Sequence, residues 1–327
     1  MKICFLDNLK ISYTSKDIYT NKIRGAENVI INLSKALSEL NHDVTVYNNC
    51  NEDTKIDKIN WKNINKIQKN TYYDLVISNN DTRMFDKVDA SKKVLISHSI
   101  QSIEKFIRKG QFFAYIKHKP KIALLSQYHK NNRNYLLRMF GSFVIDWAVD
   151  QIFLDSNLNK EINIDQAIFT SFSDRNLDLL INIWKNKIFT KNKKLKLLIT
   201  PTNNDYSQFN IINREFGNKS KLISDISNSR IFLIPGHKAE LYCIAAEEAR
   251  ELCVPIVTLG IGCLKERVIH GKTGFLAKNE NEFVDYTFKL FEDDNLWNEM
   301  RHNLFLLRGS PLVTISILLL GHIFLKF

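Results

Sequence analysis

Two glutamates in the C-terminal half of the chain are spaced for recognition of a polar ligand. Glu240 follows the apolar run 231–234, and Glu248 comes eight positions later, inside a predicted helix. The buried stripe of that helix consists of Ala245, Ala249 and Leu252. Glu248 falls on the same stripe, where a carboxylate is costly unless a partner satisfies it. We therefore expect Glu248 to bond a polar ligand or a specific donor; the alternative is a side chain at the rim of the stripe that reaches water.

The other charged residues of this helix are predicted to face water. Glu247, Arg250 and Glu251 fall on the side opposite the stripe. The start of the helix, near Tyr242 and Cys243, offers free N–H groups and the positive end of the helix dipole, which suit a phosphate. The pattern thus predicts an anion-binding helix end between two carboxylates.

Strand ends are where ligands of open α/β sheets bind. After the helix, the apolar run 255–257 re-enters the predicted sheet and leads into the turn 260–262, with Glu266 downstream. In the N-terminal half, His98 follows the apolar run 94–96 in the same way, the alternative being a structural or surface histidine. Gly25 and Ala26 precede a helix and allow the backbone to approach a substrate closely.

These residues need a scaffold in which buried strands alternate with helices. Short apolar runs alternate with helical patterns along the chain, which indicates parallel sheets covered on both faces. The predicted strands are residues 2–6, 44–47, 75–77, 94–96, 122–125, 166–170, 195–200, 230–234 and 255–258. The predicted helices include 26–40, 176–187 and 282–305, whereas the polar stretch 55–69 is predicted as a surface helix or loop.

The pattern predicts two doubly wound α/β domains that meet near residues 150–165. Residues 1–155 form the N-terminal Rossmann-like domain, 156–309 the C-terminal one, and 310–327 an apolar tail. As a helix the apolar run of the tail would span roughly 22 Å, short of the ~30 Å hydrocarbon core of a bilayer. A buried terminal element, a membrane-contacting tail and a sequence artefact all stay open, but a transmembrane span is not expected.

Composition excludes several classes of protein. The chain has 327 residues, of which 44% are apolar and 25% charged, so it is not a disordered, collagen-like or polytopic membrane protein. Five scattered cysteines argue against a disulfide scaffold, and no Cys/His cluster has the spacing of a zinc site. The N-terminus lacks the long apolar core of a signal peptide, so we expect a cytoplasmic protein with reduced thiols.

Positive charge is concentrated in one segment. The formal net charge is +11, and between Glu104 and Phe140 nine Lys and Arg residues face a single acid, Glu104 itself. Such a patch attracts anionic partners: phosphorylated substrates, acidic lipid headgroups or nucleic acid. The alternative is a lysine- and asparagine-rich coding bias that affects the whole chain.

The residues from Glu240 onward resemble the signature of glycosyltransferase family 4, the retaining nucleotide-sugar transferases of GT-B fold (glycosyl transferases group 1). The C-terminal residues that carry the resemblance are Glu240, Glu248-Ala249, 255–257, 262–266 and 271–276. The N-terminal ones are Arg24-Gly25-Ala26-Glu27, 33–40 and 42–46, and the interdomain segment is 147–150. The resemblance implies a GT-B architecture, in which two Rossmann-like domains face a cleft.

The resemblance also implies a role for each candidate of the C-terminal domain. Glu240 would contact the donor sugar near the reacting centre, and Glu248 the ribose hydroxyls. Backbone groups of Tyr242, Cys243 and Ile244 would receive the diphosphate. The family usually has Gly-Phe-Gly after the first glutamate, where this chain has Leu-Tyr-Cys, a difference that bears on which sugar fits.

Three further roles follow from the resemblance. Arg175 would clamp the phosphates, because a guanidinium pairs bidentately with phosphate oxygens; the alternative is a solvated residue at a helix start. The earlier basic residue of the family's pair is absent, and Thr170 stands about where it would fall. His98 would lie near the transferred sugar as a catalytic residue, and Gly25 and Ala26 would form the acceptor or phosphate loop.

The sequence therefore predicts a hexosyltransferase-like enzyme of glycan or cell-envelope polysaccharide synthesis. It would move a sugar, with retention and without a metal or other cofactor, from a nucleotide-diphosphate sugar to a saccharide or lipid-linked acceptor. It would work in the cytoplasm, at the inner face of the membrane if residues 105–138 contact an anionic surface, and would bind no nucleic acid. The alternatives are a GT-B epimerase, a non-catalytic protein that binds a nucleotide sugar and, more distantly, a basic nucleic-acid-binding protein.

Overall fold

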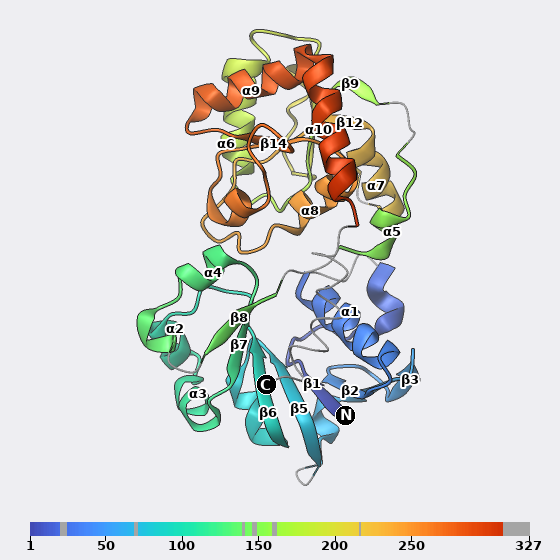
Figure 1. Cartoon of the computed structure of the whole chain (residues 1–327), viewed down its shortest axis with the longest axis vertical. Coiled ribbons are helices and arrows are strands. Elements are labelled where there is room, and N and C mark those ends of the chain that lie inside the picture. Colours follow the sequence, from blue (N-terminus) through green and yellow to red (C-terminus); the bar gives the residue numbers. More distant parts are fainter. Residues whose placement is uncertain are drawn as a thin grey trace. The chain divides into compact units, whose positions relative to one another are not determined.

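The computed structural model describes residues 1–19, 25–68, 71–138, 141–145, 149–158, 162–215 and 217–309. The chain divides into two compact units, of which unit 1 includes Met1–Ala148 and unit 2 is Val149–Ser310 (Figure 1). The predicted apolar tail 310–327, Arg24 of the N-terminal motif and residues 147–148 of the interdomain motif lie outside the described residues.

Unit 1 is built on an eight-stranded sheet in the order β3-β4-β2-β1-β5-β6-β7-β8. Its strands pair in parallel, with the exception of the antiparallel pair β3 and β4. They are β1 (Lys2–Leu6), β2 (Asp43–Asn48), β3 (Thr54–Ile56), β4 (Ile59–Asn63), β5 (Tyr72–Asn79), β6 (Asp89–Ile96), β7 (Lys121–Leu124) and β8 (Ser142–Val144). The central strands are buried on both faces, as the unbroken apolar runs predicted.

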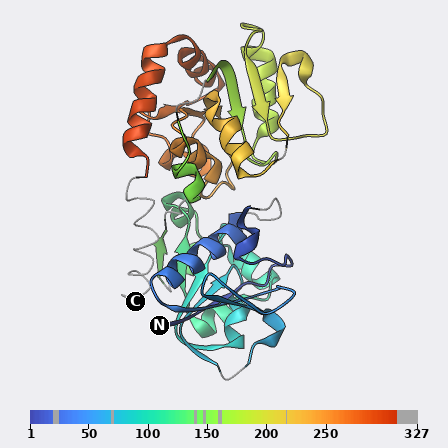
Figure 2. The same cartoon turned by 90° about the vertical axis from the view of Figure 1, so that its right-hand side faces the viewer.

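The helices of unit 1 cover this sheet. They are α1 (Gly25–Glu39), α2 (Ile103–Arg108), α3 (Phe112–His118) and α4 (Gln127–Asn131), with a short 3₁₀ turn, η4, at Tyr135–Arg138. α1 packs on β2 and β4 through its apolar stripe, and Figure 2 shows it lying across the sheet. Helices α2 and α3 contact each other and stand together at one side of unit 1 in Figure 1.

The prediction of a surface helix or loop at residues 55–69 is wrong. β3 and β4 form a hairpin there, turning at Asp57 and Lys58, whose φ angles are 53° and 63°. Ile59 and Trp61 are buried, and β4 pairs in parallel with β2. Two apolar residues two positions apart are a strand signal, which the surrounding lysines and asparagines obscured.

Unit 2 contains a six-stranded parallel sheet in the order β11-β10-β9-β12-β13-β14. Its strands are β9 (Asn163–Phe169), β10 (Lys196–Ile199), β11 (Ile211–Asn213), β12 (Ser229–Leu233), β13 (Ile256–Thr258) and β14 (Gly274–Leu276). Its helices are α5 (Gln151–Leu154), α6 (Leu177–Ile183), α7 (Lys219–Ser227), α8 (Ile244–Glu251), α9 (Glu280–Glu292) and α10 (Asp294–Leu307). The predicted alternation of strand and helix is confirmed.

One predicted helix is in fact two. The periodicity of residues 282–305 predicts a single helix, but α9 ends at Glu292 and α10 begins at Asp294. Asp293 separates them with an extended backbone, and its carboxylate accepts a hydrogen bond from the Leu296 N–H at 3.0 Å. An aspartate that caps a new helix offers the backbone an alternative to continuing the old one. The break lets α9 pack on β12, β13 and β14 while α10 contacts α8.

The topology of unit 2 brings three loops to one edge. β9, β12 and β13 are neighbours that run in the same direction, so their carboxyl ends meet. The loops that follow them carry Arg175, Glu240 and Gly262 in turn. In the part of the chain that the structure describes, no helix has both the length and the apolar character needed to cross a membrane.

Candidate active site

The loop that carries Glu240 is held by backbone contacts to the turn after β13. Gly236 bridges to Ile261, and the N–H of Cys263 donates to the carbonyl of Glu240 at 3.0 Å. Gly262 has a φ of 75°, and a Cβ there would lie 2.4 Å from the carbonyl oxygen of His237. Only glycine fits so close an approach in this conformation, so the turn is a rigid support for Glu240.

Glu240 meets Arg175 at the carboxyl edge of the sheet. Oε2 of Glu240 lies 3.5 Å from Nε of Arg175, whose Nη1 also contacts Asp174 at 3.0 Å. Oε2 is buried and has no hydrogen bond to any described residue. Burial raises the pKa of Glu240, while Arg175 and the Cys243 N–H oppose the rise. A buried carboxylate oxygen without a hydrogen bond is a natural acceptor for ligand hydroxyls.

The N-terminus of α8 opens beside Glu240. Cys243 precedes the helix in the left-handed conformation, with a φ of 59°, and no side chain caps the helix start. The first N–H groups of an α-helix have no acceptor within the helix and carry the positive end of its dipole. Burial raises the pKa of the Cys243 thiol well above its ordinary value, so this residue offers backbone groups rather than a thiolate.

Glu248 lies one turn into α8 and is only half-buried. Burial raises the pKa of its carboxyl to about 7, although Lys219 and Arg214 lower it, and Asp150 raises it. Lys219, at the start of α7, forms an ion pair with Asp150, and Arg214 pairs with Asp225 at 3.1 Å. Glu248 is therefore a carboxylate beside two cations that are already paired with other acids.

The prediction that Glu247, Arg250 and Glu251 face solvent is wrong. Glu247 and Glu251 are fully buried, more so than Glu248. Glu247 accepts from Arg250 at 2.8 Å and from Arg267 at 3.0 Å, and Arg250 also bonds Glu251 at 2.7 Å. The cause is tertiary: α10 contacts α8, and Arg267 arrives from the segment after β13.

This buried ion network also supports the segment just before α8. The guanidinium of Arg267 stacks on the ring of Tyr242, 4.3 Å from its centroid. Tyr242 and Cys243 are buried, whereas Ile244 is 36% exposed. Sequence reasoning missed the network, although an i, i+3 pair of Glu247 and Arg250 was visible; nothing in the sequence placed Arg267 against them.

In unit 1, His98 follows the carboxyl end of β6, as predicted. Burial and the nearby His129 lower the pKa of His98 to about 4, so its imidazole is neutral at physiological pH. Ser99 accepts a hydrogen bond from the ring of His129 at 3.0 Å, which anchors the same loop. A neutral imidazole can accept or donate a hydrogen bond but does not supply a positive charge.

Gly25 and Ala26 begin α1, and a Cβ added to Gly25 would meet no atom within 4 Å. As far as the described residues go, the space beside Gly25 is therefore open to a ligand. Sequence reasoning missed a polar cluster around Asp7. The buried carboxylate of Asp7 accepts hydrogen bonds from the Leu9 N–H at 3.1 Å and from the Tyr13 hydroxyl. Burial raises the pKa of Asp7, and the negative charge of Glu27, the residue after Ala26, adds to the rise. The isolated Asp7 at the end of a predicted strand was the available signal.

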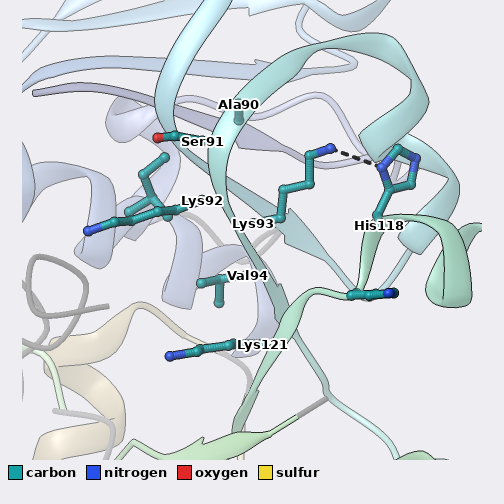
Figure 3. Close-up of a pocket in the computed structure, with 9 residues that line it drawn as sticks. Ala90, Ser91, Lys92, Lys93, Val94, His118 and Lys121 are labelled. Carbon is teal, nitrogen blue, oxygen red and sulfur yellow. Dashed lines mark hydrogen bonds between the residues drawn. The ribbon is translucent and has the colours of Figure 1, made fainter. Parts of the chain in front are cut away.

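The structure thus assembles the predicted site in two groups. Glu240, Arg175, the start of α8 and Glu248 belong to unit 2, and His98, Gly25 and Ala26 belong to unit 1. A separate pocket of about 270 Å³ in unit 1 lies toward the amino ends of β6 and β7 (Figure 3). There Lys93 bonds His118 at 2.9 Å, while Lys92 and Lys121 project to the other side of the view, so the lysines do not converge on one point.

Comparison with known proteins identifies the family. The sequence profile of the glycosyl transferases group 1 family matches residues 190–304, which include Glu240, Glu248 and the turn at Gly262. Residues 190–304 are therefore similar to the group 1 glycosyltransferases. The match confirms the resemblance expected from the Glu240–Glu248 motif and indicates a glycosyltransferase. A search of curated protein sequences finds no match.

Solved structures similar to this glycosyltransferase confirm the fold. HepE from Anabaena, solved with UDP, is 14% identical, with a TM-score of 0.70 over 100% of both chains. The sucrose-phosphate synthase of Thermosynechococcus elongatus is 12% identical, with a TM-score of 0.68 over 100% of this chain and 99% of that one. WaaG, a glycosyltransferase involved in lipopolysaccharide biosynthesis, is 10% identical, with a TM-score of 0.65 over 96% and 97%. The GT-B fold predicted from the sequence is confirmed.

Proposed function

We propose that this glycosyltransferase binds a nucleoside-diphosphate sugar at the carboxyl edge of unit 2 and transfers its sugar to an acceptor held by unit 1. The observation that carries the proposal is the convergence of Glu240, Arg175 and the start of α8 at one strand edge, with Glu248 one turn further on. HepE has been solved with UDP and with UDP-glucose, which makes UDP-hexoses the first donors to test.

Each group then has a defined task. Glu248 accepts hydrogen bonds from the ribose hydroxyls, for which a half-buried, ionisable carboxylate is suited. Arg175 and the N–H groups at the start of α8 hold the diphosphate. Glu240 has one oxygen near Arg175 and bonds the hydroxyls of the sugar, which fixes the anomeric carbon against the acceptor.

The reaction would be driven mainly by stabilisation of the leaving group. As the bond between the anomeric carbon and the phosphate oxygen breaks, its electron pair goes to the diphosphate, whose growing charge Arg175 and the α8 dipole stabilise. The acceptor oxygen attacks the same face, and its proton passes to the departing phosphate, so configuration is retained. Because Arg175 and α8 supply the positive charge, we propose that no divalent metal is required.

The acceptor side belongs to unit 1. His98, a neutral imidazole at the end of β6, would hydrogen-bond the transferred sugar, and the open space beside Gly25 and Ala26 would receive the acceptor. The acceptor is a saccharide or a lipid-linked saccharide. The basic segment 105–138 would place the enzyme on an anionic membrane surface at the cytoplasmic side.

A thermal-shift screen tests the donor site. Nucleoside diphosphates and their sugars are added to the wild type, to Glu248→Ala and to Glu292→Ala, a control at an exposed glutamate of α9. We expect at least one nucleotide sugar to stabilise the wild type and the control, and to have little effect on Glu248→Ala. Equal stabilisation of all three proteins would show that the nucleotide binds elsewhere.

Product analysis then separates transfer from the rival activities. A transferase consumes the donor in proportion to the glycosylated acceptor that forms, and with the donor alone it shows at most slow hydrolysis. Conversion of the donor sugar into its epimer without an acceptor would identify an epimerase, and binding without any turnover would identify a non-catalytic protein.

A further inference from the structure

Large apolar side chains stand exposed on three adjoining elements of unit 1. We call this surface the α2–α3–η4 face, and its apolar members are Ile107, Phe113, Ile116, Tyr135 and Leu136. Phe113 is 83% exposed and Tyr135 is 80% exposed, more than any other large apolar side chain in the described residues. Isolated exposed apolar residues need no explanation, but a group on adjoining elements marks an interaction surface.

These side chains are not part of a badly packed core, because other residues of the same three elements already form a well-packed one. Phe106 of α2, Tyr115 of α3 and Leu137 of η4 are buried, and the rings of Phe106 and Tyr115 meet edge to face at 5.2 Å. The Tyr115 hydroxyl donates to the carbonyl of Leu137 at 2.7 Å, which ties α3 to η4. Each element therefore packs inward through its own buried residues and leaves other apolar residues exposed.

Exposed basic residues lie on the same elements and next to them. The exposed cations are Arg108 on α2, Lys109 after it, Lys117 on α3, Lys119 after it, Lys130 on α4 and Arg138 on η4. Burial and then the neighbouring Lys109 and Arg108 lower the pKa of Lys105, as expected where like charges crowd together. Asp86 offsets part of the charge by pairing with Lys117 and His118.

One of the nine basic residues of the segment has a different role. Arg133 is 3% exposed, and it bonds the Gln101 side chain at 3.0 Å and the carbonyl of Leu137. It therefore fastens η4 to the loop before α2 and contributes little to the surface charge. The sequence count overstated the charged surface by at least this residue, and the face depends on the exposed ones.

We propose that the α2–α3–η4 face docks on an anionic lipid bilayer, with Phe113 and Tyr135 inserted at the level of the headgroups. The exposed residues are the combination that such surfaces need: apolar side chains for the acyl boundary and cations for the lipid phosphates. A nucleic acid would use the cations and could stack on the aromatic rings but has no use for Ile107, Ile116 and Leu136. The charge complementarity fits either polyanion, and the exposed apolar residues beside the cations favour the lipid surface.

Docking also narrows the class of acceptor, a step that rests on the proposed function. The face adjoins the loop that carries His98: the N–H of Asn134 donates to the carbonyl of Gln101 at 3.2 Å, and Ser99 bonds the His129 ring. A unit 1 that lies on a bilayer by this face holds the His98 loop at the membrane surface. The acceptor it would meet there is a saccharide carried on a lipid.

Vesicle flotation with the full chain tests the proposal. Vesicles of phosphatidylcholine alone are compared with vesicles that also contain phosphatidylglycerol, at low and high salt. We expect binding only to the anionic vesicles, weakened by salt. Arg108→Gln with Lys109→Gln should weaken binding about thirtyfold, the factor that corresponds to about 1 kcal/mol for each charge. Phe113→Ser should weaken it about tenfold or more.

Matched variants in unit 2 provide the controls. Phe305→Ser removes an exposed phenylalanine, and Lys193→Gln with Lys194→Gln removes two exposed lysines; both should bind vesicles like the wild type. The proposal fails if the wild type does not bind anionic vesicles, if binding does not depend on lipid charge, or if the control variants lose as much vesicle binding as the test variants. It also fails if Phe113→Ser instead converts a dimer into a monomer in sedimentation experiments.

Donor binding separates this proposal from the function it rests on. Thermal stabilisation by the nucleotide sugar should be the same in Phe113→Ser and the wild type, because the donor site lies in unit 2. Loss of vesicle binding with an intact donor response supports the docking face. Transfer to free saccharides but not to lipid-linked ones would overturn the acceptor class and leave the glycosyltransferase activity in place.

Discussion

Acidification should weaken donor binding through Glu248. Burial raises the pKa of this carboxyl to about 7, in spite of Lys219 and Arg214 nearby. If the ionised form receives the ribose hydroxyls, the competent fraction falls from about 90% at pH 8 to about 10% at pH 6. The apparent Kd of the donor should therefore rise about tenfold over this interval, because affinity scales with the competent fraction.

Glu248→Gln removes both the charge and the titration. Its Kd should be constant between pH 6 and pH 8, and about tenfold or more above that of the wild type at pH 8, the usual effect of losing a charged hydrogen bond. The substitution should also stabilise the protein without donor. Because folding raises the pKa of Glu248, the stability that its protonated form provides is complete below about pH 4.5 and is lost as the pH rises through about 7. The Glu248→Gln variant should therefore have a free energy of unfolding about 1–3 kcal/mol higher than that of the wild type at pH 8.

Isothermal titration calorimetry with the most stabilising nucleotide sugar measures the affinities. A sugar ester of a nucleoside diphosphate keeps its charge between pH 6 and pH 8, so the ligand itself adds no titration. Glu292→Gln, at an exposed position of α9, should follow the wild type at every pH. Equal wild-type affinity at pH 6 and pH 8, or a pH dependence that survives in Glu248→Gln, would refute the reasoning.

Glu240→Gln should lower kcat about a hundredfold and change donor affinity less than threefold, because its carboxylate acts near the reacting centre; steady-state kinetics with a binding titration measure the split. Gly262→Ala should lower the free energy of unfolding by about 1–3 kcal/mol, since a Cβ would lie 2.4 Å from the His237 carbonyl; urea unfolding measures the loss, and an unchanged midpoint would contradict the rigid turn. The transfer rate should be the same in EDTA as in Mg²⁺, because Arg175 and α8 supply the positive charge; a rate that falls in EDTA and returns with Mg²⁺ would contradict the metal-independent proposal.

Local sequence pattern predicted most of the scaffold. Buried parallel strands are continuous apolar runs, so β1, β2, β5 and β12 were visible without tertiary information. Prediction from local pattern failed at β4, where Ile59 and Trp61 stand among polar residues. It also failed at Asp293, where a helix cap divides a continuous helical periodicity into two helices. In both places the local signal was present, but the polar residues around β4 and the continuous periodicity across Asp293 outweighed it.

The candidate site, too, was predictable from the sequence only in part. The spacing of Glu240 and Glu248 around a helix start predicted the family, and the profile match over residues 190–304 agrees. The burial of their neighbours was not predictable: helical spacing placed Glu247 and Glu251 in solvent, yet they lie in a closed ion network. The basic segment was visible as charge, but the buried Arg133 and the exposed Phe113 were not.

By itself the sequence determined the order of strands and helices, the family and the residue types of the donor site, since these depend on spacing along one element. Only the tertiary structure decided that Arg175 meets Glu240, that Arg267 stacks on Tyr242 and pairs with Glu247, and that apolar side chains of α2, α3 and η4 stay exposed. Burial and pairing are properties of what arrives from elsewhere in the chain, and no local pattern contains them.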